Sequence, residues 1–251
     1  MSVFKSFAAI MQFDIRLIAR DQLLLLIVIM IAVIVAALTL AGHYRAGLGL
    51  EGFGQWLPYF LILAVISNPA SYGMVFGLLL VEEVETRVRS ALLITPVGPV
   101  WFVLMRTPLL VVMLTLIGFG MGYGIGTAWG FDALSGVQWL AISAVTAMIG
   151  PAIMILMSTF ASNRVEALAM GKLFSAITTP PVLLYLLPDD AWYRVAFLIF
   201  PTTPVLHAFE AFRQGADVSD YQWLIWAILY AIGLTALAVR RYLAKSYGVV
   251  A

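Results

Sequence analysis

The stretch VEEVETRVRSALLITP, residues 81–96, is a charged island between two long apolar runs. It holds three acids and two bases within eight residues, although only 11% of the 251 residues are charged: Glu82, Glu83, Glu85, Arg87 and Arg89. Thr95-Pro96 ends the helix-prone part, because proline lacks an N–H and disfavours helix in the preceding residue. The pattern predicts a short helix along a membrane surface, with a charged face and a leucine face that carries Leu92 and Leu93. An ordinary solvated loop is the alternative.

The composition on either side of the island is that of a membrane protein. Hydrophobic residues make up 63% of the chain and the mean hydropathy is +1.02, whereas soluble domains are about 45–50% apolar. A net charge of +1 argues against a nucleic-acid partner. The chain has no cysteine, which excludes disulfides, zinc–thiolate sites and a cysteine nucleophile.

The apolar runs predict an all-α fold with six transmembrane helices, because a helix crosses the hydrocarbon core in about 20 residues. An apolar patch at residues 195–206 is too short for a seventh span and is broken by Pro201 and Pro204. The six predicted spans are residues 22–42, 52–81, 107–131, 133–163, 173–188 and 221–239.

Lysine and arginine are distributed unevenly between the loops. With both termini in the cytoplasm, the inner segments hold 11 of the 14 basic residues. Because basic residues favour the cytoplasmic side, we predict a multi-pass protein of the cytoplasmic membrane with the charged island inside. Residues 1–21 have an amphipathic pattern that predicts an interfacial helix; a cytoplasmic extension of the first span is the alternative.

The island resembles the region after the second span of ABC-2 type transporter permeases. The Glu-x-Glu, leucine-pair and Thr-Pro elements of that family match Glu83, Glu85, Leu92, Leu93, Thr95 and Pro96. The family's Gly-Thr step is replaced by Arg87-Val88, which is typical of a divergent subfamily. The resemblance implies that residues 82–96 form the coupling helix that docks on a separate ATP-binding subunit. The docking residues would be Glu82, Glu83, Glu85, Arg87, Arg89, Leu92, Leu93, Thr95 and Pro96.

Other segments are similar to the same family, in the same order. Asp14-x-Arg16 and Arg20-Asp21 precede the first span, and Glu166-Ala167-Leu168 with Lys172 starts the fifth. Residues 188–220, which contain FPTTP at 200–204, look like the family's paired outer re-entrant helices. The resemblance covers most of the chain and implies a single ABC-2-like transmembrane domain, of the type V exporter kind, over residues 1–251.

Glycines recur every four residues in the third span, at Gly118, Gly122, Gly126 and Gly130. Small residues at this spacing allow helix backbones to approach closely in lipid. We predict helix packing within one subunit; a contact between two subunits is the alternative.

Prolines are predicted to break the second span at Pro58 and Pro69, the fourth at Gly150-Pro151 and the fifth at Pro180-Pro181. Neighbouring polar groups can satisfy the carbonyls that such breaks release. Asn68, Thr178, Thr179 and Pro180 lie in the second and fifth spans, where the ABC-2 family builds its subunit interface and substrate path. We therefore interpret these four residues as a substrate path, with static helix kinks as the alternative.

Several chemistries find no support in the sequence. The chain has no phosphate-binding loop, so ATP and magnesium would be bound by the partner ATPase and not by this chain. Its two histidines, His43 and His207, lie in different outer loops and predict neither a metal site nor a catalytic residue. In the outer loop, Glu210 and Arg213 instead form a pair at helical spacing.

We therefore expect a permease subunit, not an enzyme, of an ATP-driven ABC exporter. Its uncharged spans favour an apolar or amphiphilic cargo such as a drug, a lipid-linked molecule or a peptide. Expected partners are an ABC ATP-binding subunit, a second permease subunit in a homo- or heterodimer, and membrane lipid. The alternatives are an integral-membrane lipid-modifying enzyme and a receptor or immunity-type membrane protein without turnover.

Overall fold

The computed structural model describes residues 12, 14–86, 98–188, 192–216 and 221–247, and this part of the chain contains helices and no strand. Short 3-10 helices lie at Glu51–Gln55, Pro180–Leu186 (η3) and Trp192–Ile199 (η4), and a π-helical turn lies at Gly120–Gly124. The α-helices are α2 (Gln22–His43), α3 (Leu57–Glu85), α5 (Gly98–Phe119), α6 (Ile125–Trp129), α7 (Gly136–Ala147), α8 (Gly150–Phe160), α9 (Arg164–Thr178), α10 (Thr203–Arg213) and α11 (Gln222–Tyr247).

Six helical stretches are long and apolar enough to cross a membrane, which confirms the predicted number. They are Leu24–His43, Leu57–Glu85, Val103–Trp129, Gly136–Phe160, Arg164–Leu186 and Gln222–Ser246. The third and fifth begin earlier than predicted, because Arg106 and Arg164 lie within the helices instead of before them. Charge-free runs alone therefore place the ends of these two spans wrongly.

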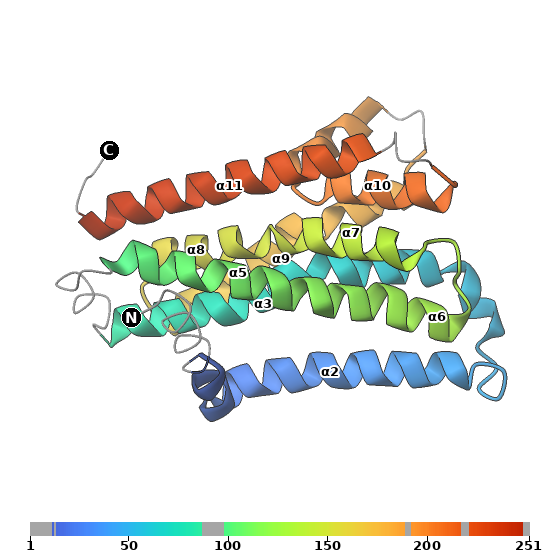
Figure 1. Ribbon diagram of the computed structural model, residues 1–251, viewed down its shortest axis with the longest axis horizontal. Helices are drawn as coiled ribbons and strands as arrows, with labels where there is room; N and C mark the ends of the chain where they lie inside the picture. Colours follow the sequence, from blue (N-terminus) through green and yellow to red (C-terminus); the bar gives the residue numbers. More distant parts are fainter. Residues whose placement is uncertain (1–11, 13, 87–97, 189–191, 217–220, 248–251) are drawn as a thin grey trace.

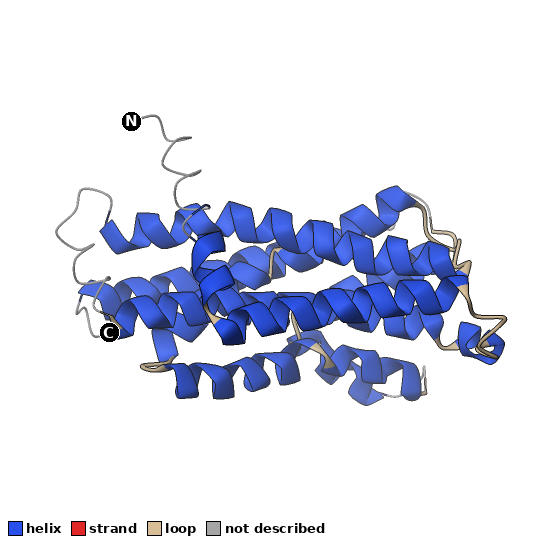
Figure 2. Cartoon of the chain, turned by 90° about the horizontal axis from the view of Figure 1, so that it is seen from below, coloured by secondary structure: helices blue, strands red, loops and turns tan. Residues whose placement is uncertain are grey.

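Helix α3 forms the centre of the bundle and packs against α5, α8 and α9. Helix α11 lies on α8 and α10 at one edge, and α2 lies at the opposite edge with its main contact on α6 (Figure 1). Seen from below, the described chain consists of helices joined by loops (Figure 2). Most side chains of α3 and α8 are buried, whereas α2 exposes long aliphatic side chains along most of its length. An exposed apolar helix of this kind is stable only next to lipid or another protein.

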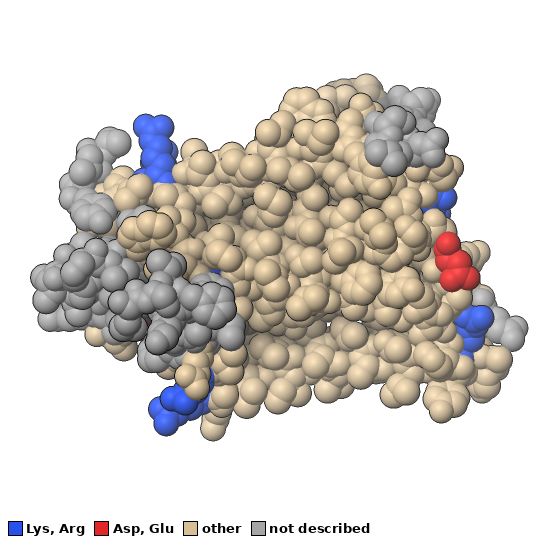
Figure 3. Space-filling model, viewed as in Figure 1, with Lys and Arg blue, Asp and Glu red and all other residues tan. Residues whose placement is uncertain are grey.

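The surface also has the character of a membrane protein. In the view of Figure 3, charged side chains lie at the two ends of the long axis, and the wide band between them is uncharged. The start of α2 and the end of α11 lie at the same end of the bundle (Figure 1). We call this the inner end, after the predicted orientation.

Proline and glycine break the fourth and fifth spans where the sequence predicted, but the break predicted in the second span is wrong, because α3 starts at Pro58 and continues through Pro69. Helix α7 ends at Ala147 and α8 starts at Gly150-Pro151. A Cβ at Gly150 would lie 2.3 Å from Leu114, so the missing side chain allows α5 to approach closely. The fifth span changes from α-helix to 3-10 helix at Pro180, and the Thr202 hydroxyl donates to the Thr178 carbonyl at 2.6 Å. A neighbouring hydroxyl thus satisfies a carbonyl at the break.

At the outer end, η4 and α10 are joined by a bend of 119°, which fits either a re-entrant pair or one broken span. The apolar side chains of Val205, Phe209 and Phe212 on α10 are buried. Glu210 and Arg213 form the expected pair at 2.9 Å. The outer re-entrant helices over residues 188–220 stay a prediction, because a bent pair of this kind fits one broken span equally well.

Two of the four spaced glycines pack helices together within the chain. A Cβ at Gly118 would lie 3.2 Å from Ser143 of α7, and one at Gly122 would lie 2.3 Å from the buried ring of Trp139. Gly126 has ordinary contact distances, with its nearest neighbour Leu61 at 3.5 Å. The intramolecular interpretation thus fits Gly118 and Gly122 best.

The packing interpretation is wrong for Gly130. This residue ends α6 with φ +75°, in the left-handed region that favours glycine. The Arg45 guanidinium lies about 3.1 Å from where its Cβ would be. Gly130 therefore terminates a helix and does not join two of them.

Candidate functional site

The charged island starts inside a helix. Helix α3 continues through Glu82, Glu83 and Glu85, and its C-cap is Thr86. These three acids therefore belong to the last turn of α3 and not to a separate short helix. The remaining predicted docking residues lie outside the described part of the chain: Arg87, Arg89, Leu92, Leu93, Thr95 and Pro96.

Glu83 is part of a buried ion cluster, here called the Arg106 cluster (Asp14, Glu83 and Arg106). The guanidinium of Arg106 donates to both oxygens of Asp14, at 2.8 and 2.5 Å, and to Glu83 at 2.7 Å. The Arg106 and Asp14 side chains are at most 1% exposed, and Glu83 is 10% exposed. Burial raises the pKa of the Asp14 carboxyl, and the charge of Arg106 opposes that rise.

This cluster corrects one part of the docking prediction. A carboxylate that is buried against Arg106 cannot form the surface on which another subunit docks. The Arg106 cluster instead joins three inner segments: the helical segment around Asp14, the end of α3 and the start of α5. Buried charges persist only when paired, so these three segments are held in one arrangement.

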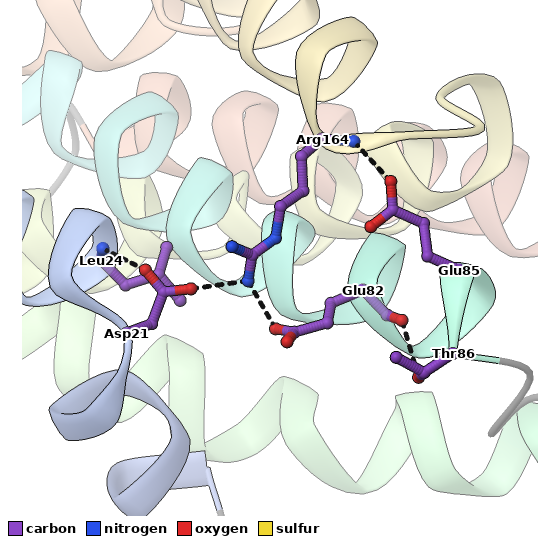
Figure 4. Close-up of polar contacts among 6 residues, drawn as sticks. All are labelled: Asp21, Leu24, Glu82, Glu85, Thr86 and Arg164. Atoms are coloured by element: carbon purple, nitrogen blue, oxygen red, sulfur yellow. Dashed lines mark hydrogen bonds and ion pairs between the residues drawn. The ribbon is translucent and has the colours of Figure 1, made fainter.

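A second group, here called the Arg164 cluster (Asp21, Glu82, Glu85 and Arg164), is shown in Figure 4. The Arg164 guanidinium donates to Asp21 at 2.5 Å and to Glu82 at 2.7 Å, and its backbone N–H donates to Glu85 at 3.0 Å. Asp21 also accepts from the backbone N–H of Leu24 at 3.1 Å, at the start of α2. The cluster thus links α2, α3 and α9, and its arginine is 35% exposed.

Sequence reasoning found the three acids and missed both arginine partners. In the sequence, Arg106 and Arg164 contribute only to the excess of basic residues on the predicted cytoplasmic side. The available signal was a pair of acids, Asp14 and Asp21, in a basic leader, together with an arginine next to an apolar run. That signal indicates that these charged side chains need partners of opposite charge, but it does not show which acid pairs with which arginine.

The predicted path residues do not meet in one place. Asn68 lines a cavity of about 500 Å³ between α2, α3 and α6. Its amide donates to the Leu114 carbonyl at 2.8 Å, and its carbonyl oxygen is buried without a hydrogen-bond partner. The cavity wall is otherwise apolar except for a few side chains such as Ser67 and Ser71.

Thr178 lines a different and smaller cavity of about 210 Å³, next to Pro201 and Tyr230. The hydroxyls of Thr178 and Thr179 donate to carbonyls of their own helix, at 3.1 and 2.8 Å. Thr179 and Pro180 mark the change of helix type. Within one chain, these residues are therefore part of a helix break, and only Asn68 faces the larger cavity.

No group of three or more possible metal ligands occurs among the described residues. His207 of α10 stacks on Trp223, with ring centroids 4.5 Å apart. His43 of α2 contacts the Thr39 carbonyl at 3.1 Å.

Six helical stretches of spanning length and a charged inner end define an α-helical, multi-pass membrane protein. Residues 14–239 match the model of a family described as fluoroquinolones export permease protein Rv2686c-like. The match covers most of the chain, so the chain belongs to this family of ABC-2 type export permeases. It confirms the resemblance that the sequence motifs indicated. None of the curated proteins matches the chain.

Proposed function

We propose that this chain is the membrane subunit of an ATP-driven exporter and that it has no enzyme activity of its own. A separate ABC subunit binds ATP and magnesium. Two permease subunits, identical or similar, form the transport path, because six helices supply too little wall to enclose one. Both termini face the cytoplasm in this arrangement.

The observation that carries this proposal is the pair of arginine clusters at the inner end. Between them they connect the end of α3 to the segment around Asp14, α2, α5 and α9. The segment that follows α3 is the one that resembles a coupling helix. A displacement of this segment by an ATPase would be transmitted to α2, α3, α5 and α9, because the ion pairs join the inner ends of these helices. Such rigid coupling supports switching between inward and outward access.

The cargo that fits best is an amphiphilic, drug-sized molecule of the fluoroquinolone type, as in the family's description. The cavity beside Asn68, at about 500 Å³, supports this proposal because drug-binding pockets measure about 300–1,000 Å³. Its apolar wall with a few polar groups suits a planar aromatic molecule that carries polar substituents.

The direct test is to purify the tagged protein from its native membrane in mild detergent and to identify the soluble proteins that accompany it. We expect a stoichiometric ABC ATPase with the wild type. Glu85→Lys reverses an exposed charge at the end of α3 and should release the ATPase. Asp132→Lys, an exposed change at the outer end, is the matched control and should retain it. A wild-type preparation without an ATPase would contradict ATP-driven export, and retention by Glu85→Lys would remove Glu85 from the docking surface.

A further inference from the structure

A second large cavity, of about 590 Å³, lies on the side of the bundle away from α2. Helix α11 forms one wall, and α5 with the α7–α8 break forms the other. Most of its lining is apolar, and one charged side chain, Arg240, lies at its inner end. The lining residues are Thr107, Val111, Met148, Pro151, Ala231, Ile232, Thr235, Ala236, Val239, Arg240 and Leu243.

The length of this groove corresponds to one leaflet of a membrane. The lining of the groove on α11 runs from Ala231 to Leu243, a rise of about 18 Å at about 1.5 Å per residue. One leaflet is about 15 Å thick in its hydrocarbon part and about 20–22 Å thick with its headgroup region. The groove therefore runs from the middle of the bilayer to its inner surface, the distance that an acyl chain covers below its headgroup.

The charge at the inner end suits an anionic headgroup. Arg240 is exposed and forms no ion pair with any residue that the structure describes. Its neighbour Arg241 is also exposed but does not line the groove. A basic side chain at the end of an apolar groove is the arrangement that recognises anionic lipid headgroups.

We infer that this groove is a binding site for one anionic phospholipid, with the phosphate on Arg240 and an acyl chain along α11. Only the assignment to the inner leaflet rests on the proposed orientation of the chain. The site itself does not depend on the ATPase or on the cargo. The lipid would fill the space left by the α7–α8 break and hold α11 against the bundle.

Native mass spectrometry of the full-length protein tests this inference, with phosphatidylglycerol and phosphatidylcholine of the same chain length added in turn. The wild type should retain one phosphatidylglycerol at concentrations where phosphatidylcholine is lost. Arg240→Gln should weaken phosphatidylglycerol binding about five-fold, since one basic residue near the surface contributes about 1 kcal/mol. Ala236→Trp, at an exposed position of the lining, should weaken binding of both lipids by filling the groove. Arg241→Gln is the matched control and should change nothing.

Three results would overturn the inference. Equal retention of the two lipids by the wild type would remove the headgroup specificity. An equal loss with Arg241→Gln would assign the effect to general surface charge. Unchanged lipid binding in Ala236→Trp, or a changed oligomeric state in either groove variant, would show that the groove holds something else, such as a second permease subunit. None of these results would bear on ATP-driven export, which the ATPase pull-down tests separately.

Discussion

The Arg106 and Arg164 clusters use the same chemistry at the same end of the bundle, but they differ in burial. Each centres on one arginine that bridges acids from the N-terminal region and the end of α3. The Arg106 side chain is fully buried, whereas that of Arg164 is 35% exposed. Water can replace the lost partner of an exposed charge but not of a buried one. The Arg106 cluster therefore contributes strongly to the stability of the fold, whereas the Arg164 cluster contributes little stability although it links α2 and α9 to α3.

The largest effect is expected from Arg106→Ala. This change leaves Asp14 and Glu83 buried without a cation, and removal of one partner from a buried pair costs about 3–5 kcal/mol. Thermal unfolding in one fixed detergent, followed by tryptophan fluorescence, measures the loss. The triple variant Asp14→Asn, Glu83→Gln and Arg106→Met removes all the charges and should regain most of the stability. An Arg106→Ala protein as stable as the wild type would show that the cluster is hydrated.

An intermediate effect is expected from Gly122→Ala, which tests burial without charge. Its new Cβ would lie 2.3 Å from the Trp139 ring, and that ring is fully buried and has no room to move. Overpacking of this kind costs about 1–3 kcal/mol. Gly124→Ala is the control in the same π-helical turn, because no atom lies within 4 Å of its Cβ position. Equal melting temperatures for the two variants would contradict close packing of this turn on α7.

The smallest effect on stability is expected from Arg164→Ala. Partly exposed pairs contribute about 0.2–1 kcal/mol, and salt weakens them. The difference in melting temperature from the wild type should therefore shrink as salt is raised from low to high concentration. The larger deficit of Arg106→Ala should persist under the same salt series. A salt-independent loss of several kcal/mol in Arg164→Ala would erase the distinction between the two clusters.

Much of the fold follows from local sequence. The apolar runs gave the correct number of spans, and Gly150-Pro151 and Pro180 marked real breaks. Span ends were less accurate where an arginine entered a helix, because the sequence does not show that a distant acid neutralises it. Gly130 was misread for a similar reason, since spacing does not distinguish a glycine between two helices from one that ends a helix.

The candidate site was less predictable. Glu82, Glu83 and Glu85 were singled out correctly as unusual, yet their partners are far away in the chain. Asp14 and Arg106 are separated by 92 residues, and Asp21 and Arg164 by 143. No periodicity links such positions, so exposed and buried acids of one helical turn look alike in the sequence.

Sequence alone determined that this protein spans a membrane six times and which of its ends gathers positive charge. These properties follow from transfer of single segments between water and lipid, which depends on composition and length. The contacts of Glu83 with Arg106, of Asn68 with a cavity and of Arg240 with the groove along α11 are visible only in the folded structure. Those contacts depend on how separate helices pack, because the energy of a charge or a cavity is set by neighbours from distant parts of the chain.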